Sequence, residues 1–186
     1  MNSLISLKPI FLLHFVLLFL IFPPLSQSSF QPLAPKGSDL IDNTCKQTPY
    51  YDLCVSSLRS DPRSSSADVQ GLALIITDMV LGNATDTLAL IEDLLKQIKD
   101  PSLEKALAYC AELYIPVVKY DLPQAIEALT KGHYKFANYS ISEAGNQADT
   151  CEKNFTGSTV SPLTDQNSLV HDLSAVAASI ANKLGG

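Results

Sequence analysis

The sequence predicts an all-α protein, an antiparallel four-helix bundle preceded by a short N-terminal α-hairpin. Three observations lead to this fold class. Apolar residues recur at steps of three and four over long segments, which is the period of an amphipathic helix. Proline, glycine and Asp-Pro signals divide these segments, and the short connections between them favour antiparallel neighbours. No segment alternates apolar and polar residues strongly enough to indicate a strand.

The first 28 residues are typical of a secretory signal peptide. The region from Ile10 to Phe22 is almost continuously apolar, and Ser26 and Ser28 offer the small side chains that a signal peptidase requires. The run is short for a bilayer span. An uncleaved anchor is the alternative, and we expect no later segment to span a membrane. The mature chain then consists of an exposed lead-in, residues 29–37, and one domain, residues 38–186.

Two short helices should precede the bundle and form the hairpin. Ser38 can cap a helix that runs to about Cys45. Pro49 can start the second helix, which carries Leu53 and Leu58 on one side. A polar loop follows and leads to the bundle.

The first bundle helix is the longest. Ser66 is a plausible N-cap, and Asp68 lies in the first turn. Asp100 as a cap and Pro101 as the first helical residue then start the next helix. The apolar stripe of the first bundle helix consists of Val69, Leu72, Ile76, Met79, Val80, Ala84, Leu88, Ile91, Leu94, Leu95 and Ile98.

The second bundle helix contains Pro116 and Pro123, which should kink or divide it because proline removes a backbone donor. We expect this helix to end at Gly132, a residue that readily takes the left-handed conformation after a helix. A third helix follows and runs to about Phe155. Ser161 and the proline after it are a start signal for the last helix.

The four cysteines predict two disulfides in an exported protein. Cys45 and Cys54 lie in the two short helices, where a hairpin brings them together. Cys110 and Cys151 remain, on apolar stripes of the second and third bundle helices, so their bond should cross the bundle interior. By the chain-entropy model the short loop contributes about 2.7 kcal/mol and the long loop about 4 kcal/mol. Zinc is the competing interpretation, but the spacings do not fit paired Cys-x-x-Cys ligands.

Composition and motifs argue against several functions. Thirteen basic residues, of which Lys8 is lost with the leader, oppose 19 acidic residues, so the mature net charge is −7. An acidic surface disfavours nucleic acid and anionic membranes. His133 and His171 have no nucleophile beside them, and the adjacent Glu92 and Asp93 point to different sides of a helix. We therefore expect a binding protein without enzymatic activity, metal or cofactor: either an enzyme inhibitor or a helical carrier of a lipid or another small molecule.

Three Asn-x-Ser/Thr triplets predict N-glycosylation in an exported chain, at Asn83, Asn138 and Asn154. Such triplets also occur by chance. With three of them, we expect at least one to be occupied.

The segments "NTCKQTPYYDLC", "LALIITDMV", "YCAELY", "DLPQAIEALTKG" and "ADTCEKNF" resemble the plant invertase and pectin methylesterase inhibitor family. The resemblance covers the chain from about Ser38 to Leu184. It implies a four-helix bundle after an α-hairpin, with the first cysteine paired to the second and the third to the fourth. It also implies an inhibitor of one of two targets, an acid invertase (β-fructofuranosidase) or a pectin methylesterase, in the apoplast, the cell wall or the vacuole.

The turn between the second and third bundle helices looks more like that of the invertase inhibitors, in which a Pro-Lys-Phe turn enters the substrate pocket. Lys135 and Phe136 match the last two residues, whereas Tyr134 stands where proline is expected. His133 could add a second cation, because histidine side chains gain charge in mildly acidic surroundings. The resemblance thus predicts a partner-binding turn at residues 134–136, and the charge of His133 extends the expected contact to residue 133. Alternatively, Phe136 is the first core residue of the third helix and Lys135 a solvated flank.

Overall fold

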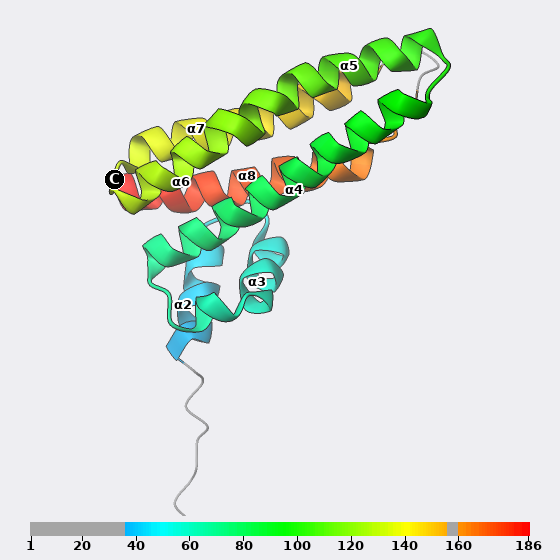
Figure 1. Ribbon diagram of the computed structural model, residues 1–186. Helices are drawn as coiled ribbons and strands as arrows, with labels where there is room; N and C mark the ends of the chain where they lie inside the picture. The colour runs from blue at the N-terminus through cyan, green and yellow to red at the C-terminus, as the bar shows by residue number, and fades with distance from the viewer. Residues whose placement is uncertain (1–35, 156–159) are drawn as a thin grey trace, which may run out of the picture. The chain divides into compact units, whose positions relative to one another are not determined.

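The computed structural model describes residues 36–155 and 160–186, and these residues form helices and turns without a strand. The predicted all-α fold class is confirmed. The expected signal peptide and nearly all of the lead-in lie outside the described residues. Figure 1 shows the helices in chain order, with the hairpin beside the bundle.

The hairpin consists of α2 (Lys36–Cys45) and α3 (Tyr51–Ser60), followed by a single 3₁₀ turn, η1 (Pro62–Ser65). Cys45 and Cys54 form the predicted disulfide, with their Cα atoms 5.6 Å apart. Both Asp42 oxygens accept hydrogen bonds from Arg59, at 2.9 and 3.0 Å. The hairpin contacts α4, and α3 also contacts α8.

Helix α4 (Val69–Gln97) begins at a different cap from the one expected. Its N-cap is Asp68, whose Oδ1 accepts a hydrogen bond from the Gly71 amide at 2.8 Å, so the expectation that Ser66 caps this helix is wrong. Ser66 instead closes the preceding 3₁₀ turn through its amide. The expected cap of the next helix is confirmed, because Asp100 Oδ1 accepts from two amides of the first turn.

The second bundle helix is divided after its first proline. Helix α5 (Pro101–Pro116) leads into a wide π turn, η2 (Val117–Asp121), and then into α6 (Leu122–Thr130). Proline has no amide to donate and its ring crowds the preceding turn, so a wider turn accommodates it while the chain keeps its direction. Helices α7 (Tyr134–Asn154) and α8 (Thr164–Gly185) complete the bundle.

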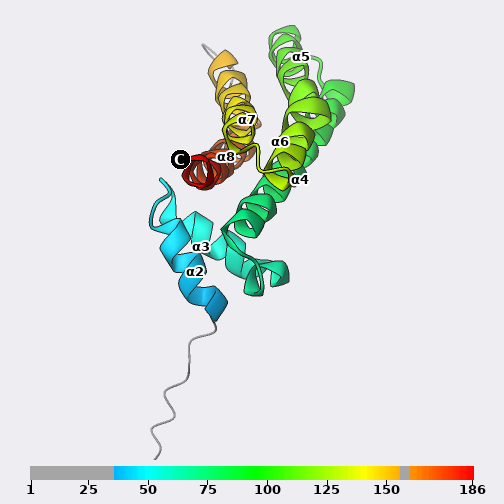
Figure 2. The same cartoon turned by 90° about the vertical axis from the view of Figure 1, so that its left-hand side faces the viewer.

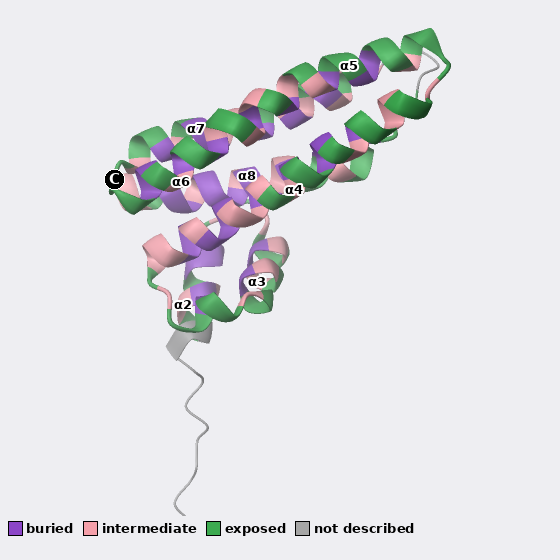
Figure 3. Ribbon diagram, in the orientation of Figure 1, coloured by how far each residue is buried: buried purple, intermediate pink, exposed green. Residues whose placement is uncertain are grey.

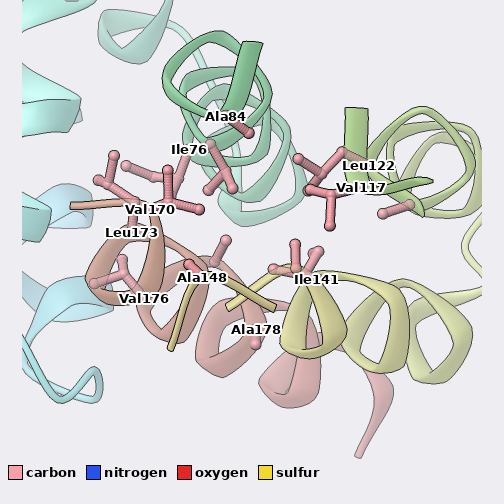
Figure 4. Close-up of a cluster of buried hydrophobic side chains, with 14 of the residues drawn as sticks. Ile76, Ala84, Val117, Leu122, Ile141, Ala148, Val170, Leu173, Val176 and Ala178 are labelled. Atoms are coloured by element: carbon pink, nitrogen blue, oxygen red, sulfur yellow. The ribbon is translucent and has the colours of Figure 1, made fainter. Parts of the chain in front are cut away.

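Around the bundle, α4 contacts α5 and α6, these contact α7, α7 contacts α8, and α8 contacts α4. Figure 2 shows this arrangement from the end of the bundle at which the C-terminus lies. The buried stripes face the centre (Figure 3). Ile76 of α4, Leu122 of α6, Ile141 of α7 and Leu173 of α8 meet there (Figure 4). Burial of such side chains contributes about 1.5–3 kcal/mol each, which is how four amphipathic helices become one body.

The second disulfide crosses the bundle interior as predicted. Cys110 of α5 and Cys151 of α7 are fully buried, and their Cα atoms are 4.9 Å apart.

Beside this disulfide lies a set of hydrogen-bonded polar side chains, which we call the interior network: Tyr114, Asn167, Glu152, Ser161 and Thr164. Tyr114 Oη donates to Asn167 Oδ1 at 2.7 Å, and Asn167 Nδ2 donates to Glu152 Oε2 at 2.7 Å. Ser161 and Thr164 donate to the same carboxylate at 2.8 and 2.6 Å. Burial by itself raises the pKa of Glu152, but the hydrogen bonds from Thr164, Asn167 and Ser161 outweigh it, so the pKa is lowered overall.

Helix α4 is long and apolar enough to cross a membrane by length and composition alone. The expectation that no segment after the leader could span a membrane is therefore wrong as far as length and composition are concerned. In the structure the buried residues of α4 form part of the bundle core. A core helix meets the same criterion, so this property is weak evidence for a membrane span.

Candidate functional site

The α6–α7 turn, residues 131–136, begins with a well-defined helix end. Gly132 has φ 76°, the left-handed conformation that was expected of it. The Gly132 amide donates to the Leu129 carbonyl at 3.1 Å, and the His133 amide donates to the Ala128 carbonyl at 2.8 Å. This pair of bonds is the Schellman motif. It fixes the direction in which the chain leaves α6.

Helix α7 starts immediately afterwards. His133 occupies its N-cap position and is exposed, and its carbonyl accepts the first helical hydrogen bond, from Ala137, at 3.1 Å. Among the described residues, the His133 side chain makes no capping hydrogen bond to the first turn of α7. The start of α7 therefore has no side-chain cap from its own N-cap residue.

Lys135 and Phe136 are both exposed, and 49% of Phe136 is accessible to solvent. The alternative that Phe136 is the first core residue of the third helix is therefore wrong, since Ala137 is the first fully buried residue of α7. The nearby Lys131 pairs with Glu127 at 2.5 Å. Within residues 36–155 and 160–186, no such ion pair engages Lys135.

Tyr134 lies differently from its neighbours. It is half-buried, and its Oη donates to Gln70 Oε1, 2.9 Å away in the first turn of α4. Gln70 Nε2 in turn donates to the Leu129 carbonyl at 2.9 Å. We call this arrangement the glutamine clamp: Gln70 with the Tyr134 hydroxyl and the Leu129 carbonyl. No motif or local pattern indicates a role for Gln70, which is 64 residues from Tyr134.

The end of α8 lies against the same turn. A Cβ atom added to Gly185 would be 3.3 Å from Tyr134 Cβ and 3.5 Å from Lys135 Cγ. Figures 1 and 2 both show the C-terminus beside the junction of α6 and α7. An open hollow of about 470 Å³ lies here. Its lining consists of Gly132, His133, Tyr134, Lys135, Phe136, Leu184 and Gly185.

The structure thus brings the four predicted turn residues together, in two roles. His133, Lys135 and Phe136 are exposed and available to a partner, whereas Tyr134 faces the bundle and holds the turn. A cation and an apolar ring on an ordered turn can enter a pocket that offers carboxylates and an apolar wall.

The other singled-out polar residues form no comparable site. His171 Nδ1 lies 3.0 Å from Asp172 Oδ1, and both side chains are half-buried on α8. Glu92 and Asp93 are exposed on α4, and Asp93 pairs with Lys96 at 2.8 Å.

The three expected glycosylation sites lie in helices, and the side-chain amide of each makes a hydrogen bond. Asn83 donates to the Met79 carbonyl at 2.8 Å. Asn138 donates to Asn182 at 3.3 Å, and Asn154 donates to the Ala106 carbonyl at 3.3 Å. The threonine of the third triplet lies outside the described residues. Glycosylation of all three remains a prediction.

Comparison with known proteins gives consistent results. A family model described as plant invertase/pectin methylesterase inhibitor matches residues 39–180. The chain is 45% identical over 148 residues to "Cell wall / vacuolar inhibitor of fructosidase 1" of Arabidopsis thaliana, covering 80% of this chain and 70% of that protein. It is 34% identical over 173 residues to a "Pectinesterase inhibitor" of Actinidia deliciosa, covering 92% of this chain and 91% of that protein.

Solved structures share the fold. A crystal structure of a mutant form of a pectin methylesterase inhibitor from Arabidopsis superposes with a TM-score of 0.68 at 24% identity, covering 76% of this chain and 95% of the other. A second structure, of a pectin methylesterase inhibitor from Arabidopsis thaliana, gives a TM-score of 0.60 at 25% identity, covering 79% of this chain and 97% of the other.

Proposed function

The chain belongs to the plant invertase/pectin methylesterase inhibitor family, and on that premise we propose that its target is an acid invertase, whose active site it occludes with the α6–α7 turn. It is an inhibitor of an invertase or a pectin methylesterase and not itself an enzyme. This membership replaces the alternative of a helical small-molecule carrier. Its fructosidase-inhibitor relative, at 45% identity, supports the choice of an invertase.

One observation carries the proposal: Lys135 and Phe136 are adjacent, exposed and held on an ordered turn. Glycoside hydrolases typically place a pair of carboxylates close together in the substrate pocket. The Lys135 ammonium would donate charge-assisted hydrogen bonds to them. Phe136 would cover an apolar part of the pocket and exclude water, and His133 would lie at the rim of the contact.

Pectin methylesterase inhibition is the second candidate. One observation favours it: the Actinidia pectinesterase inhibitor aligns with 92% of this chain, against 80% for the fructosidase inhibitor. In either case we propose that the mature protein acts after export, in the cell wall or the vacuole.

The test is a titration of the purified mature protein, residues 29–186, against one acid invertase and one pectin methylesterase. We expect stoichiometric inhibition of the invertase. Lys135→Ala should weaken it at least tenfold, because hydrogen bonds between charged groups contribute about 1.5–3 kcal/mol. Lys153→Ala is the matched control, since Lys153 is an exposed lysine in the last turn of the same helix.

Inhibition of the methylesterase alone would replace the proposed target by the second candidate. Equal inhibition constants for the parent and Lys135→Ala would remove the turn from the mechanism.

A further inference from the structure

We propose that Gln70 is a positioning residue for inhibition: through the glutamine clamp it holds the first turn of α7 so that Lys135 and Phe136 meet the target already ordered. This inference rests on the proposed function of the turn. Gln70 belongs to α4, and the cysteine-rich and turn motifs of the sequence do not include it.

The clamp joins both flanks of the turn through one side-chain amide. The Leu129 carbonyl can only accept, so the Gln70 nitrogen must face it, and the oxygen must therefore face the Tyr134 hydroxyl. Both distances are 2.9 Å, the usual length of a good hydrogen bond. Leu129 lies at the end of α6 and Tyr134 at the start of α7, so the clamp ties the two helix ends together.

The two flanks differ in how much they depend on this amide. On the α6 side the Schellman motif already fixes the backbone through Gly132 and His133. On the α7 side His133 supplies no side-chain cap to the described first turn. The Tyr134–Gln70 bond is thus a polar tether at the first residue of α7, and Lys135 and Phe136 are the next two residues along the chain.

An untethered helix start frays, and a frayed turn must lose conformational entropy when it binds. Gln70→Leu keeps a side chain of similar size on α4 but removes both bonds of the clamp. We expect it to weaken inhibition about five- to tenfold, the effect of losing one or two ordinary hydrogen bonds. Gln97→Leu, in the last turn of α4, is the matched control and should leave inhibition unchanged.

Two further readouts separate positioning from a general loss of stability. Amide hydrogen exchange in a peptide spanning residues 130–138 should accelerate in Gln70→Leu, while exchange in α8 stays as in the parent. In a double-mutant cycle, Tyr134→Phe should weaken inhibition, and the combined variant should be no weaker than Gln70→Leu alone, because Gln70→Leu already removes the Tyr134–Gln70 bond.

A third readout is rescue. Proline is well tolerated as the first residue of a helix and fixes φ there. Tyr134→Pro should therefore restore inhibition in the Gln70→Leu background to within about threefold of the parent, by replacing the tether with a stiffer backbone.

Each outcome decides a different point. If the parent inhibits neither enzyme, the proposed function fails, and the positioning role fails with it. If the parent inhibits but Gln70→Leu inhibits equally well, the proposed function stands and the positioning role is overturned. Additive losses from Gln70→Leu and Tyr134→Phe would also overturn it, as would faster exchange throughout α8.

Discussion

The interior network and the α6–α7 turn lie at opposite ends of α8, and they use polar residues in opposite ways. In the network, Tyr114, Asn167 and Glu152 find their partners inside the protein. In the turn, Lys135 and Phe136 project into solvent. Asn167 and Gly185 are 18 residues apart, or about 27 Å along the helix. Stability and the proposed recognition therefore depend on separate groups of residues, so they should respond to separate mutations.

The largest expected effect is a loss of stability on removal of a disulfide. Replacing Cys110 and Cys151 by alanine should lower the free energy of unfolding by about 4 kcal/mol, because the denatured chain loses a long covalent loop. Replacing Cys45 and Cys54 should cost about 2.7 kcal/mol, since that loop is shorter. Urea unfolding of both double variants measures the difference. A larger loss for the short loop would contradict the chain-entropy explanation.

A smaller loss should follow from Asn167→Leu. Asn167 is 2% exposed and accepts from Tyr114, so the variant leaves a buried hydroxyl and part of a carboxylate without a partner. We expect about 2–3 kcal/mol of destabilisation. The inhibition constant, measured well below the melting temperature, should not change. A loss of inhibition as large as that of Lys135→Ala would show that the interior network also affects binding by the turn.

A second substitution should recover part of the stability that Asn167→Leu loses. Adding Tyr114→Phe to Asn167→Leu removes the unpaired hydroxyl, so the double variant should be more stable than Asn167→Leu alone. Equal stability of the two variants would show that the tyrosine hydroxyl is not what Asn167 satisfies.

In an otherwise unchanged protein, Tyr134→Pro should have a small net effect on inhibition, within about threefold of the parent, because two contributions oppose each other. Proline fixes φ before binding, whereas loss of the Tyr134 hydroxyl breaks the bond to Gln70. The free energy of unfolding should fall by about 2 kcal/mol, because the variant loses the hydrogen bond and part of the packing of the half-buried ring. Thermal unfolding and inhibition assays on the same sample measure both. A tenfold loss of inhibition would contradict the expected balance between the two contributions.

The smallest expected effect is on the pH dependence of stability. The pKa of Glu152 is lowered in the folded protein, so its contribution to stability is complete above the unfolded value of about 4.3 and is lost as pH falls below it. The contribution should thus be constant between pH 7 and pH 5. The melting temperatures of the parent and Glu152→Gln should differ by the same amount at pH 7 and pH 5, and the difference should shrink as pH falls below the unfolded value of about 4.3. Convergence already at pH 5 would contradict the lowered pKa.

Local signals made much of this fold predictable. The recurrence of apolar residues at steps of three and four predicted the helices. Gly132 and Asp100 mark helix boundaries because their conformations depend on adjacent residues. The error at Ser66 has the same origin, since two good caps lie two residues apart and only the 3₁₀ turn decides between them. The π turn after Pro116 is one of several ways to accommodate a proline.

The residues that hold the candidate site were beyond sequence reasoning. Gln70 and Tyr134 are 64 residues apart, and Tyr114 and Asn167 are 53 apart. Such hydrogen bonds depend on the relative rotation of packed helices, which no local pattern encodes. The exposure of Phe136 was undetermined for the same reason, because a phenylalanine at a helix start suits a core or a surface equally.

The long-range disulfide has a consequence for how this protein is inactivated by proteolysis. The loop between Cys110 and Cys151 contains α6 and the whole α6–α7 turn. Lys131 and Lys135 are exposed there, and a trypsin-like protease that cuts after either would leave both fragments joined through sulfur. The nicked chain gains one water and keeps its size on a non-reducing gel, but the turn that we propose to bind the target is broken. The amount of full-size protein before reduction therefore does not measure inhibitory capacity; the amount after reduction does.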